Sequence, residues 1–434
     1  MSPTERLLAL LDHLGLKRAH IATQMPGDIA GLASMHGERL AGIVLCVPTR
    51  LDPAQFQHVS DRLLMICGAG GLTADVTSRA AQRLSGAARH VLADYDAPGW
   101  ADVMADRTAE IATRMTGFLD GHAASAPTAP KQEGMHAEIT YRIEGAGPAL
   151  LLLPFFLAPS QWAPAMPALT RHFSVVTLGG PHLGGVAALE DRAKAPTYQA
   201  MFRTLIDIMA PKPGEAILDV GCGAGSLDRL LAKRLGSANP ITAMDTNAFL
   251  RSEAATLAKA EGVDATIRFV PGDAEKLPFP DASFGCAFSV TVLEECDADR
   301  AIAEMKRVVK PGGRIGIVVR ALDMPQWWNL KLPPDITEKI VVPPQSVAAK
   351  GVADASLYRR MREGGLVDLT CFPSLITLDR PEGPIWRYRE DHVLSLLSGE
   401  QMPTWRATRD AAEQAGLLFM AHPMHCAVGV KPAA

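Results

Sequence analysis

EAILDVGCGAGSLDRLL, from Glu215 to Leu231, is the stretch that decides the fold of the second half of this chain. An apolar run rich in strand-forming residues leads into three alternating glycines, and a segment with helical apolar spacing follows. Glycines at such a turn let the backbone bend sharply and approach a ligand that a Cβ atom would repel. Alone, the stretch is compatible with a dinucleotide, a phosphate or another adenosine-containing cofactor, and also with close packing and no ligand.

The bulk composition is that of a globular protein with sizeable cores. The chain has 434 residues, 48% of them hydrophobic and 21% charged, which is enough for two or three domains. The net charge of −4 leaves no basic excess to neutralise phosphates, so a nucleic-acid partner is not expected. The seven cysteines form no C-x-x-C pair, a pattern typical of reduced thiols, and a cytoplasmic location is predicted. No apolar run is long enough to span a membrane.

The chain divides at a segment crowded with alanine, proline and serine, Gly121 to Met135, which we interpret as a linker. A weaker break lies near Arg192. We therefore expect one domain over residues 1–190, with the linker at 121–135, and a second over 195–434. The less regular segment 321–434 is expected to form a substrate-binding lid.

Short apolar strand patterns alternate with amphipathic helix patterns between residues 215 and 320. This alternation predicts an α/β fold with a parallel, doubly wound sheet whose ligand lies at the carboxyl ends of the strands. The third glycine stands at Gly225, whereas the dinucleotide fingerprint G-x-G-x-x-G requires a glycine where Ser226 stands. Asp245, about twenty residues after the loop, suits a ribose in either a nicotinamide or an adenosylmethionine site.

Four motifs in this order, LDVGCGAG, AMD, GDAEKLPFPDASF and RVVKPGG, resemble the class I S-adenosylmethionine-dependent methyltransferases. The resemblance covers roughly residues 198–320 and is nearest to the ubiquinone and menaquinone C-methyltransferases. It implies a Rossmann-like fold, S-adenosyl-L-methionine as the cofactor, and a small-molecule methyl acceptor. By position it implies eight cofactor-binding residues: Asp219, Gly221, Gly223, Gly225, Asp245, Asp273, Ala274 and Ser289.

Structural alternatives exist for several of these residues. Asp273 is also a suitable helix cap and Asp245 a suitable turn residue, which is the commoner fate of such aspartates. Cys222 is expected to be a small packing residue. His422, His425 and Cys426 are expected to be structural, and no metal site is predicted.

Methyl transfer needs alignment of the acceptor with the methyl group, and it needs a base only if the acceptor loses a proton. No catalytic residue is assigned from the sequence. Glu294 and Glu295 follow the fourth strand of the predicted sheet, where they either face the pocket or begin a helix, and we expect the latter. For the acceptor pocket the candidates are Tyr198, Trp327 and Trp328, with packing between sheet and lid as the alternative for the tryptophans.

The first half resembles an α/β-hydrolase without its catalytic groups. The G-x-S-x-G elbow would fall on Thr23 to Gly27, where Met25 occupies the place of the serine. Gly71 stands at the position of the triad aspartate, and no histidine occurs between His90 and His122. Hydrolysis by a triad is therefore not expected.

The order of the hydrolase-like segments is also unusual, because Ile139 to Gly185 resembles the first strands of that fold but follows the later ones. We interpret the first half as a circularly permuted, degenerate hydrolase domain, the alternative being two unrelated α/β fragments. Its role is left open between shaping the acceptor site, forming a homodimer and stabilising the chain.

The function predicted from the sequence is methyl transfer from S-adenosylmethionine to a small, apolar molecule by in-line displacement. The alternatives are a non-catalytic, cofactor-binding regulatory module and a nicotinamide-dependent oxidoreductase. The sequence does not identify the acceptor atom.

Overall fold

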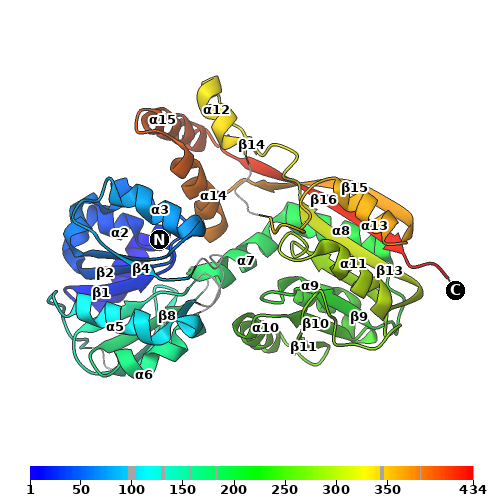
Figure 1. Ribbon diagram of the computed structural model, residues 1–434, viewed down its shortest axis with the longest axis horizontal. Helices are drawn as coiled ribbons and strands as arrows, with labels where there is room; N and C mark the ends of the chain where they lie inside the picture. Colours follow the sequence, from blue (N-terminus) through cyan, green and yellow to red (C-terminus); the bar gives the residue numbers. More distant parts are fainter. Residues whose placement is uncertain are drawn as a thin grey trace. The chain divides into compact units, whose positions relative to one another are not determined.

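The computed structural model describes residues 1–95, 103–128, 132–155, 159–180, 183–342, 347–381 and 383–433 (Figure 1). Two compact units divide the chain. The first comprises Met1–Ala188 together with Glu382–Ser395, and the second comprises Leu189–Pro381 together with Leu396–Ala434. Part of the predicted lid segment, including most of helix α14 (Gly383–Leu396), therefore groups with the first unit.

One eight-stranded sheet organises the first unit, in the order β4-β3-β2-β1-β7-β8-β6-β5. Strand β6 is antiparallel to both of its neighbours, β5 and β8, and the remaining pairs are parallel. The strands are β1 (Ala19–Thr23), β2 (Leu40–Cys46), β3 (Leu63–Gly68), β4 (Ala88–Leu92), β5 (Glu133–His136), β6 (Ile139–Gly145), β7 (Ala149–Leu152) and β8 (Ser174–Gly179). Strand β1 pairs directly with β7, so both segments of the first half belong to one sheet.

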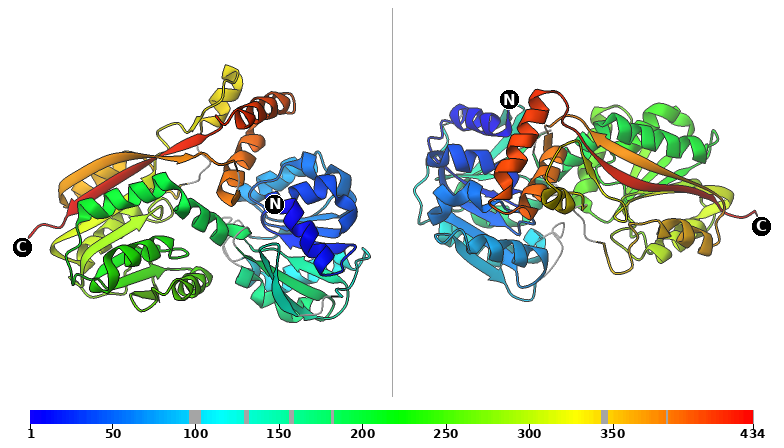
Figure 2. Two further views of the ribbon diagram at one scale, coloured as in Figure 1. Left: turned by 180° about the vertical axis from the view of Figure 1, so that it is seen from behind. Right: turned by 90° about the horizontal axis from the view of Figure 1, so that it is seen from above.

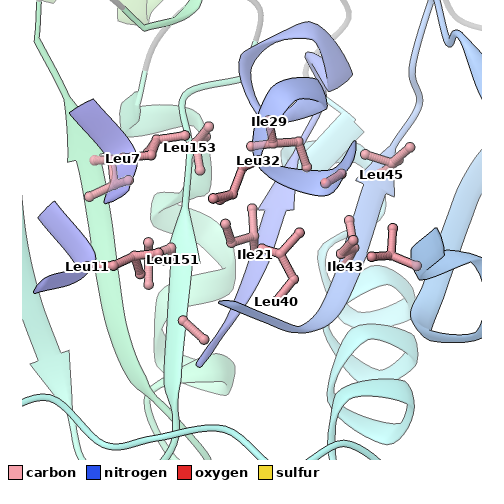
Figure 3. Close-up of a cluster of buried hydrophobic side chains, with 14 of the residues drawn as sticks. Leu7, Leu11, Ile21, Ile29, Leu32, Leu40, Ile43, Leu45, Leu151 and Leu153 are labelled. Carbon is pink, nitrogen blue, oxygen red and sulfur yellow. The ribbon is translucent and has the colours of Figure 1, made fainter. Parts of the chain in front are cut away.

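Helices cover both faces of this sheet. Figure 3 shows one face, where Leu7 and Leu11 of α1 pack with Ile21 of β1 and Leu151 of β7, all fully buried. On the other face, Ile111 and other residues of α5 pack against the alternate side chains of the same strands. The helices are α1 (Pro3–His13), α2 (Ala30–Met35), α3 (Gly71–Ala81), α4 (Val103–Asp106), α5 (Thr108–Leu119) and α6 (Met166–Leu169), with 3-10 helices at Pro26–Asp28, Gly37–Arg39, Pro53–Arg62 and Pro159–Ala165. Helix α7 (Gly184–Lys194) is divided between the two units, which separate after Ala188.

The predicted linker is held against the start of β1 over its described first half. The amide of Ser125 donates to the carbonyl of Arg18 at 2.8 Å, and that of Thr128 donates to Leu14 at 2.9 Å. Gly15 permits this approach, since it has a φ of +69° and a Cβ there would lie 1.9 Å from Thr128 Oγ1. The linker is also shorter than predicted, because β5 begins at Glu133.

The second unit is built on the predicted doubly wound sheet, in the order β11-β10-β9-β12-β13-β16, with β14 and β15 both paired to β16. The five strands from β11 to β13 are parallel, and β16 runs antiparallel to β13. The strands are β9 (Ile217–Val220), β10 (Ile241–Asp245), β11 (Ile267–Pro271), β12 (Phe284–Val290), β13 (Val309–Arg320), β14 (Trp327–Trp328), β15 (Val367–Leu378) and β16 (Met420–Val430). The sequence prediction of strands alternating with helices up to residue 320 is confirmed.

The segment after residue 321, expected to form a lid, extends the sheet with its longest strands, β15 and β16 (Figures 1 and 2). Helices α8, α9 and α10 pack on one face, and α11 and α13 pack on the other. The helices are α8 (Pro196–Met209), α9 (Ser226–Leu235), α10 (Ala248–Ala260), α11 (Ala298–Val308), α12 (Pro334–Ile340), α13 (Ser356–Glu363) and α15 (Gln401–Gln414), with a 3-10 helix at Gly236–Ala238. The carboxyl ends of β9, β10 and β12 thus lie at one edge, where an open α/β sheet binds its ligand.

Within the described ranges, no helix is long and apolar enough to cross a membrane. All seven cysteines are free thiols.

Candidate functional site

The glycine loop joins β9 to α9 at the carboxyl edge of the second sheet. Gly221, Gly223 and Gly225 have φ values of +86°, +54° and +71°, a region that favours glycine. The amides of Gly221 and Cys222 both donate to the carbonyl of Met244 at 2.7 and 2.9 Å. The loop is therefore tied to the end of β10, in the conformation that the three glycines make possible.

A close contact joins this loop to the turn that follows β12. A Cβ on Gly221 would lie 2.2 Å from Val292 Cγ2, so only glycine fits there. Thr291, the residue before Val292, has a φ of +59°, which is strained for a β-branched side chain. Strain of this kind is commonly found at functional sites, where the surrounding structure enforces it.

The predicted ribose-binding acid, Asp245, is brought to the glycine loop. Its Oδ2 accepts from the amide of Gly223 at 2.9 Å, and its Oδ1 accepts from the amide of Asn247 at 2.8 Å. A carboxylate has about four lone-pair positions, so each oxygen retains room for a further donor. The turn role considered for Asp245 is thus present, and it leaves the carboxylate able to accept two ribose hydroxyls.

Two buried carboxyl groups lie next to each other beside the loop, one on Asp219 of β9 and one on Asp228 of α9. Burial raises the pKa of Asp219, and the neighbouring charge of Asp228 raises it further. Burial also raises the pKa of Asp228 to about 7, although Asp219 and Arg229 oppose the change. Apart from the carboxyl of Asp219, no donor among the described residues reaches either oxygen of Asp228. Such a pair, sharing a proton when empty, is suited to receive a cationic group.

The next residue, Arg229, locks the loop in place. Its guanidinium donates to the carbonyl of Ala224 at 2.7 Å and forms ion pairs with Glu190 at 2.5 Å and Glu261 at 2.9 Å. The Arg229 side chain is only 4% exposed, so these contacts are shielded from water. Neither Asp228 nor Arg229 was predicted from the sequence. The position of Asp228 within the apolar stripe of α9, before Leu231 and Ala232, nevertheless indicates a buried acid.

The other predicted cofactor residues have mixed surroundings. Asp273 is exposed, and its Oδ1 accepts from the amide of Glu275 at 2.9 Å, as expected for a turn residue. Ala274 is buried. Ser289 is fully buried, and its hydroxyl donates to the carbonyl of Val220 at 2.8 Å, tying β12 to β9.

The expectation for Glu294 is wrong. Helix α11 begins at Ala298, because Asp297 caps it by accepting from the amide of Arg300. Glu294 is fully buried, and its Oε1 accepts from the amide of Arg320 at 2.8 Å. Tyr198 on α8 is also buried, with 1% exposure.

The two tryptophans predicted for the acceptor pocket point to opposite faces of β14. Trp328 is 5% exposed and packs against Trp405 with ring centroids 5.1 Å apart, as the packing alternative expected. Trp327 is 52% exposed and contacts the ring of Phe419.

The histidines of the last strand have structural partners. His425 hydrogen-bonds to Tyr358 at 2.9 Å and to Asp323 at 2.8 Å. No group of three or more metal-ligating side chains occurs in the part of the chain that the structure describes.

The charge of the site distinguishes between ligands. A dinucleotide would place its pyrophosphate at the glycine loop, next to two buried carboxyl groups that would repel it. S-adenosylmethionine carries an ammonium and a sulfonium, both positive. The buried carboxyl pair of Asp219 and Asp228 therefore fits S-adenosylmethionine and does not fit a dinucleotide.

Comparison with known proteins agrees with this choice. A family described as "Methyltransferase domain" matches residues 218–317, from β9 into β13. The chain is 34% identical over 117 residues to the ubiquinone/menaquinone biosynthesis C-methyltransferase UbiE of Legionella pneumophila (strain Corby), covering 27% of this chain and 47% of that protein. It is 36% identical over 107 residues to the sterol 24-C-methyltransferase ERG6B of Gibberella zeae, covering 24% of this chain and 28% of that protein.

A solved structure, the YcgJ protein of Bacillus subtilis, aligns with a TM-score of 0.39 and 18% identity, over 54% of this chain and 100% of that chain. The chain spans about half, or less, of the length of the curated relatives it matches.

Replacing Asp228 with asparagine is expected to change how stability depends on pH. The unfolded chain releases the Asp228 proton near pH 3.8, whereas the folded protein keeps it to about pH 7. Wild-type stability is therefore lost as the pH rises through this window. Asp228→Asn should remove much of that loss, which is on the order of a few kcal/mol for a pKa raised from 3.8 to about 7. The free energy of unfolding is measured in urea at pH 4.5 and 7.5, and hydrogen exchange of the α9 amides reports the local stability at the same two pH values.

The matched control is Asp264→Asn, since Asp264 is exposed. If Asp228→Asn loses as much stability as the wild type between the two pH values, the raised pKa of the buried Asp228 carboxyl is contradicted.

Proposed function

We propose, from the premise that residues 218–317 form an S-adenosylmethionine-dependent methyltransferase domain, that this chain transfers a methyl group to a small molecule. The observation that carries the proposal is the glycine loop with the buried carboxyl of Asp228, whose only partner among the described residues is the carboxyl of Asp219. Close backbone approach at the glycine loop suits the methionine part of the cofactor, and the acid pair suits its positive charge.

Each end of the proposed cofactor site has a distinct chemistry. Asp219 and Asp228 would receive the methionyl ammonium, and Asp245 would accept from the ribose hydroxyls. Asp273 and Ala274 would lie beside the adenine, as the resemblance implies. When bound, the cofactor supplies an electrophilic methyl group on a sulfonium. The protein then has to align the acceptor with that methyl group and exclude water.

The acceptor we propose is a small molecule with an apolar body. The apolar side chains of α8 line the face of the sheet beside Asp219, where Phe202 contacts Phe288 with ring centroids 5.5 Å apart. The relatives named above are C-methyltransferases of quinone biosynthesis and of sterols, which agrees with an apolar acceptor.

For the first unit we propose a circularly permuted α/β-hydrolase domain that has lost hydrolysis. Its support is the sheet order: the strands from residues 133–179 and those from 19–92 fill separate halves, which meet where β7 pairs with β1. Met25 stands in place of the nucleophile, and its φ of −108° lies outside the left-handed region. Its amide donates to Thr23 Oγ1 at 2.9 Å in a simple turn.

The methyl-transfer proposal predicts that the purified chain binds S-adenosylhomocysteine with one-to-one stoichiometry and shows no calorimetric response to NAD. With methyl-labelled S-adenosylmethionine and a panel of quinols, sterols and phenols, label should pass to an acceptor. Binding of NAD without S-adenosylhomocysteine would contradict the proposal. Cofactor binding without transfer to any acceptor would favour a regulatory module.

Replacing Asp245 with alanine should weaken S-adenosylhomocysteine binding by at least about tenfold, on the scale of a lost charge-assisted hydrogen bond. Isothermal titration calorimetry measures the change. Asp264→Ala is the matched control, because Asp264 lies on the loop between α10 and β11 and is exposed. Equal affinities of Asp245→Ala and wild type would remove the ribose assignment.

If the first unit is a degenerate hydrolase domain, a fluorophosphonate probe should label no serine in residues 1–188. The reason is that no serine occupies the elbow and no triad aspartate or histidine stands at the matching positions. Mass spectrometry of the treated protein, with a known serine hydrolase as the positive control, tests this. Stoichiometric labelling of any serine there would refute the interpretation.

A further inference from the structure

Three polar groups of the second unit are buried without a hydrogen-bond partner near the carboxyl edge of its sheet. They are the hydroxyl of Tyr198, Oε2 of Glu294 and Nε of Arg192, none of which finds a partner in the described ranges. Tyr198 and Glu294 are 1% and 0% exposed. Buried polar groups are nearly always paired, so three unpaired groups together indicate a place for a polar ligand.

The Glu294 side chain is held rigidly at this place. Its Oε1 accepts from the amide of Arg320. This hydrogen bond joins the turn after β12 to the end of β13, just beyond the last paired residues of the two strands. Its own carbonyl accepts from the amide of Ala348 at 2.8 Å, and the carbonyl of Leu293 accepts from Val352 at 2.9 Å. Oε2 is therefore left free by a side chain that is fixed at both ends.

Three charged groups face Tyr198 and Glu294 from neighbouring elements. The Arg192 guanidinium lies 4.9 Å from the centre of the Tyr198 ring. Burial raises the pKa of Glu294, while the charges of Arg320 and Arg192 oppose the change. Burial likewise raises the pKa of Tyr198, with Arg192 and Arg320 opposing and the acids Asp219 and Glu294 adding to it.

The same contacts place the three groups beside the proposed cofactor site. Asp219 is the register partner of Phe288, and Phe288 contacts Phe202, one helical turn after Tyr198. Tyr198 is thus close enough to feel the charges of both Asp219 and Glu294. An acceptor held by Tyr198 and Glu294 would lie next to the cofactor.

We propose that Glu294 is a catalytic residue that takes a proton from the methyl acceptor, while Tyr198 and Arg192 hold the acceptor's oxygen. The acceptor is then a small apolar molecule that carries an acidic O–H, or a C–H next to a carbonyl group. This inference rests on the proposed methyl-transfer function and specifies the substrate class of that site.

The step balances in atoms and charge. The acceptor's proton passes to Oε2 of the Glu294 carboxylate, and the electron pair it leaves behind forms the bond to the methyl carbon. The carbon–sulfur bond breaks with its electrons remaining on sulfur, giving a neutral thioether. One positive sulfonium and one negative carboxylate thereby become two neutral groups, which suits a buried site.

The test that needs no acceptor compares the Glu294 carboxyl in the complexes with S-adenosylmethionine and with S-adenosylhomocysteine. Carbon-13 NMR of protein labelled at the glutamate carboxyls, with the Glu294 resonance assigned by its loss in Glu294→Gln, follows the titration. The positive sulfonium should raise the proton dissociation constant at Glu294 at least about threefold relative to the thioether.

A Glu294 resonance that does not respond to the exchange of cofactors, whether it titrates alike in both complexes or in neither, would overturn the inference. Failure of both cofactors to bind would instead overturn the proposed function, and this inference with it.

Activity gives the second test, on any acceptor that the wild type methylates in the panel above. Glu294→Gln keeps the Oε1 acceptor for Arg320 and should lower kcat at least about 100-fold, the scale of general-base catalysis, with S-adenosylhomocysteine affinity unchanged. Glu338→Gln, an exposed glutamate of α12, is the matched control. Unchanged kcat in Glu294→Gln, or methylation only of acceptors without an acidic proton, would contradict the proposal.

Discussion

Burying a carboxyl group without a hydrogen-bond donor costs free energy, and the second unit does this repeatedly at one edge of its sheet. Within the part of the chain that is described, Asp228 has only the neighbouring carboxyl of Asp219 as a partner, and Oε2 of Glu294 has none. The surrounding structure enforces both: Arg229 locks the glycine loop, and Glu294 is fixed through the amide of Arg320. Folding alone gains nothing from these groups, whereas a cationic cofactor and a proton-donating acceptor would satisfy them.

Periodicity and glycine spacing were sufficient to predict the parallel half of the second sheet, because its strands are short apolar runs joined by amphipathic helices. They were insufficient for β15 and β16, whose antiparallel pairing joins residues such as Thr370 and Val428 that are far apart in sequence. Pro373 in one strand and Pro423 in the other also weaken any local strand signal. Long-range pairing of this kind depends on which edge of the sheet remains open, which no local pattern encodes.

The candidate site likewise contains residues that local sequence predicts and residues that it does not. The glycines and Asp245, which the structure brings together, could be predicted as candidates because their chemistry depends on local sequence. Glu294 was misassigned to a helix start, although Asp297, three residues later, is the better cap. The cofactor role of Ser289 stays a prediction, since its hydroxyl serves the contact between β12 and β9. In the first unit, strands far apart in sequence pair in one sheet, while the circularly permuted hydrolase stays a proposal.

The affinity for S-adenosylhomocysteine, determined by calorimetry at pH 6 and pH 8, tests whether the buried acid pair binds the cofactor. If the Asp219–Asp228 pair receives the ammonium, the pair must release its shared proton on binding, so affinity should rise with pH through about 7. In Asp228→Asn this dependence should be largely lost. No binding, or equal affinity of the wild type at both pH values, would contradict the account.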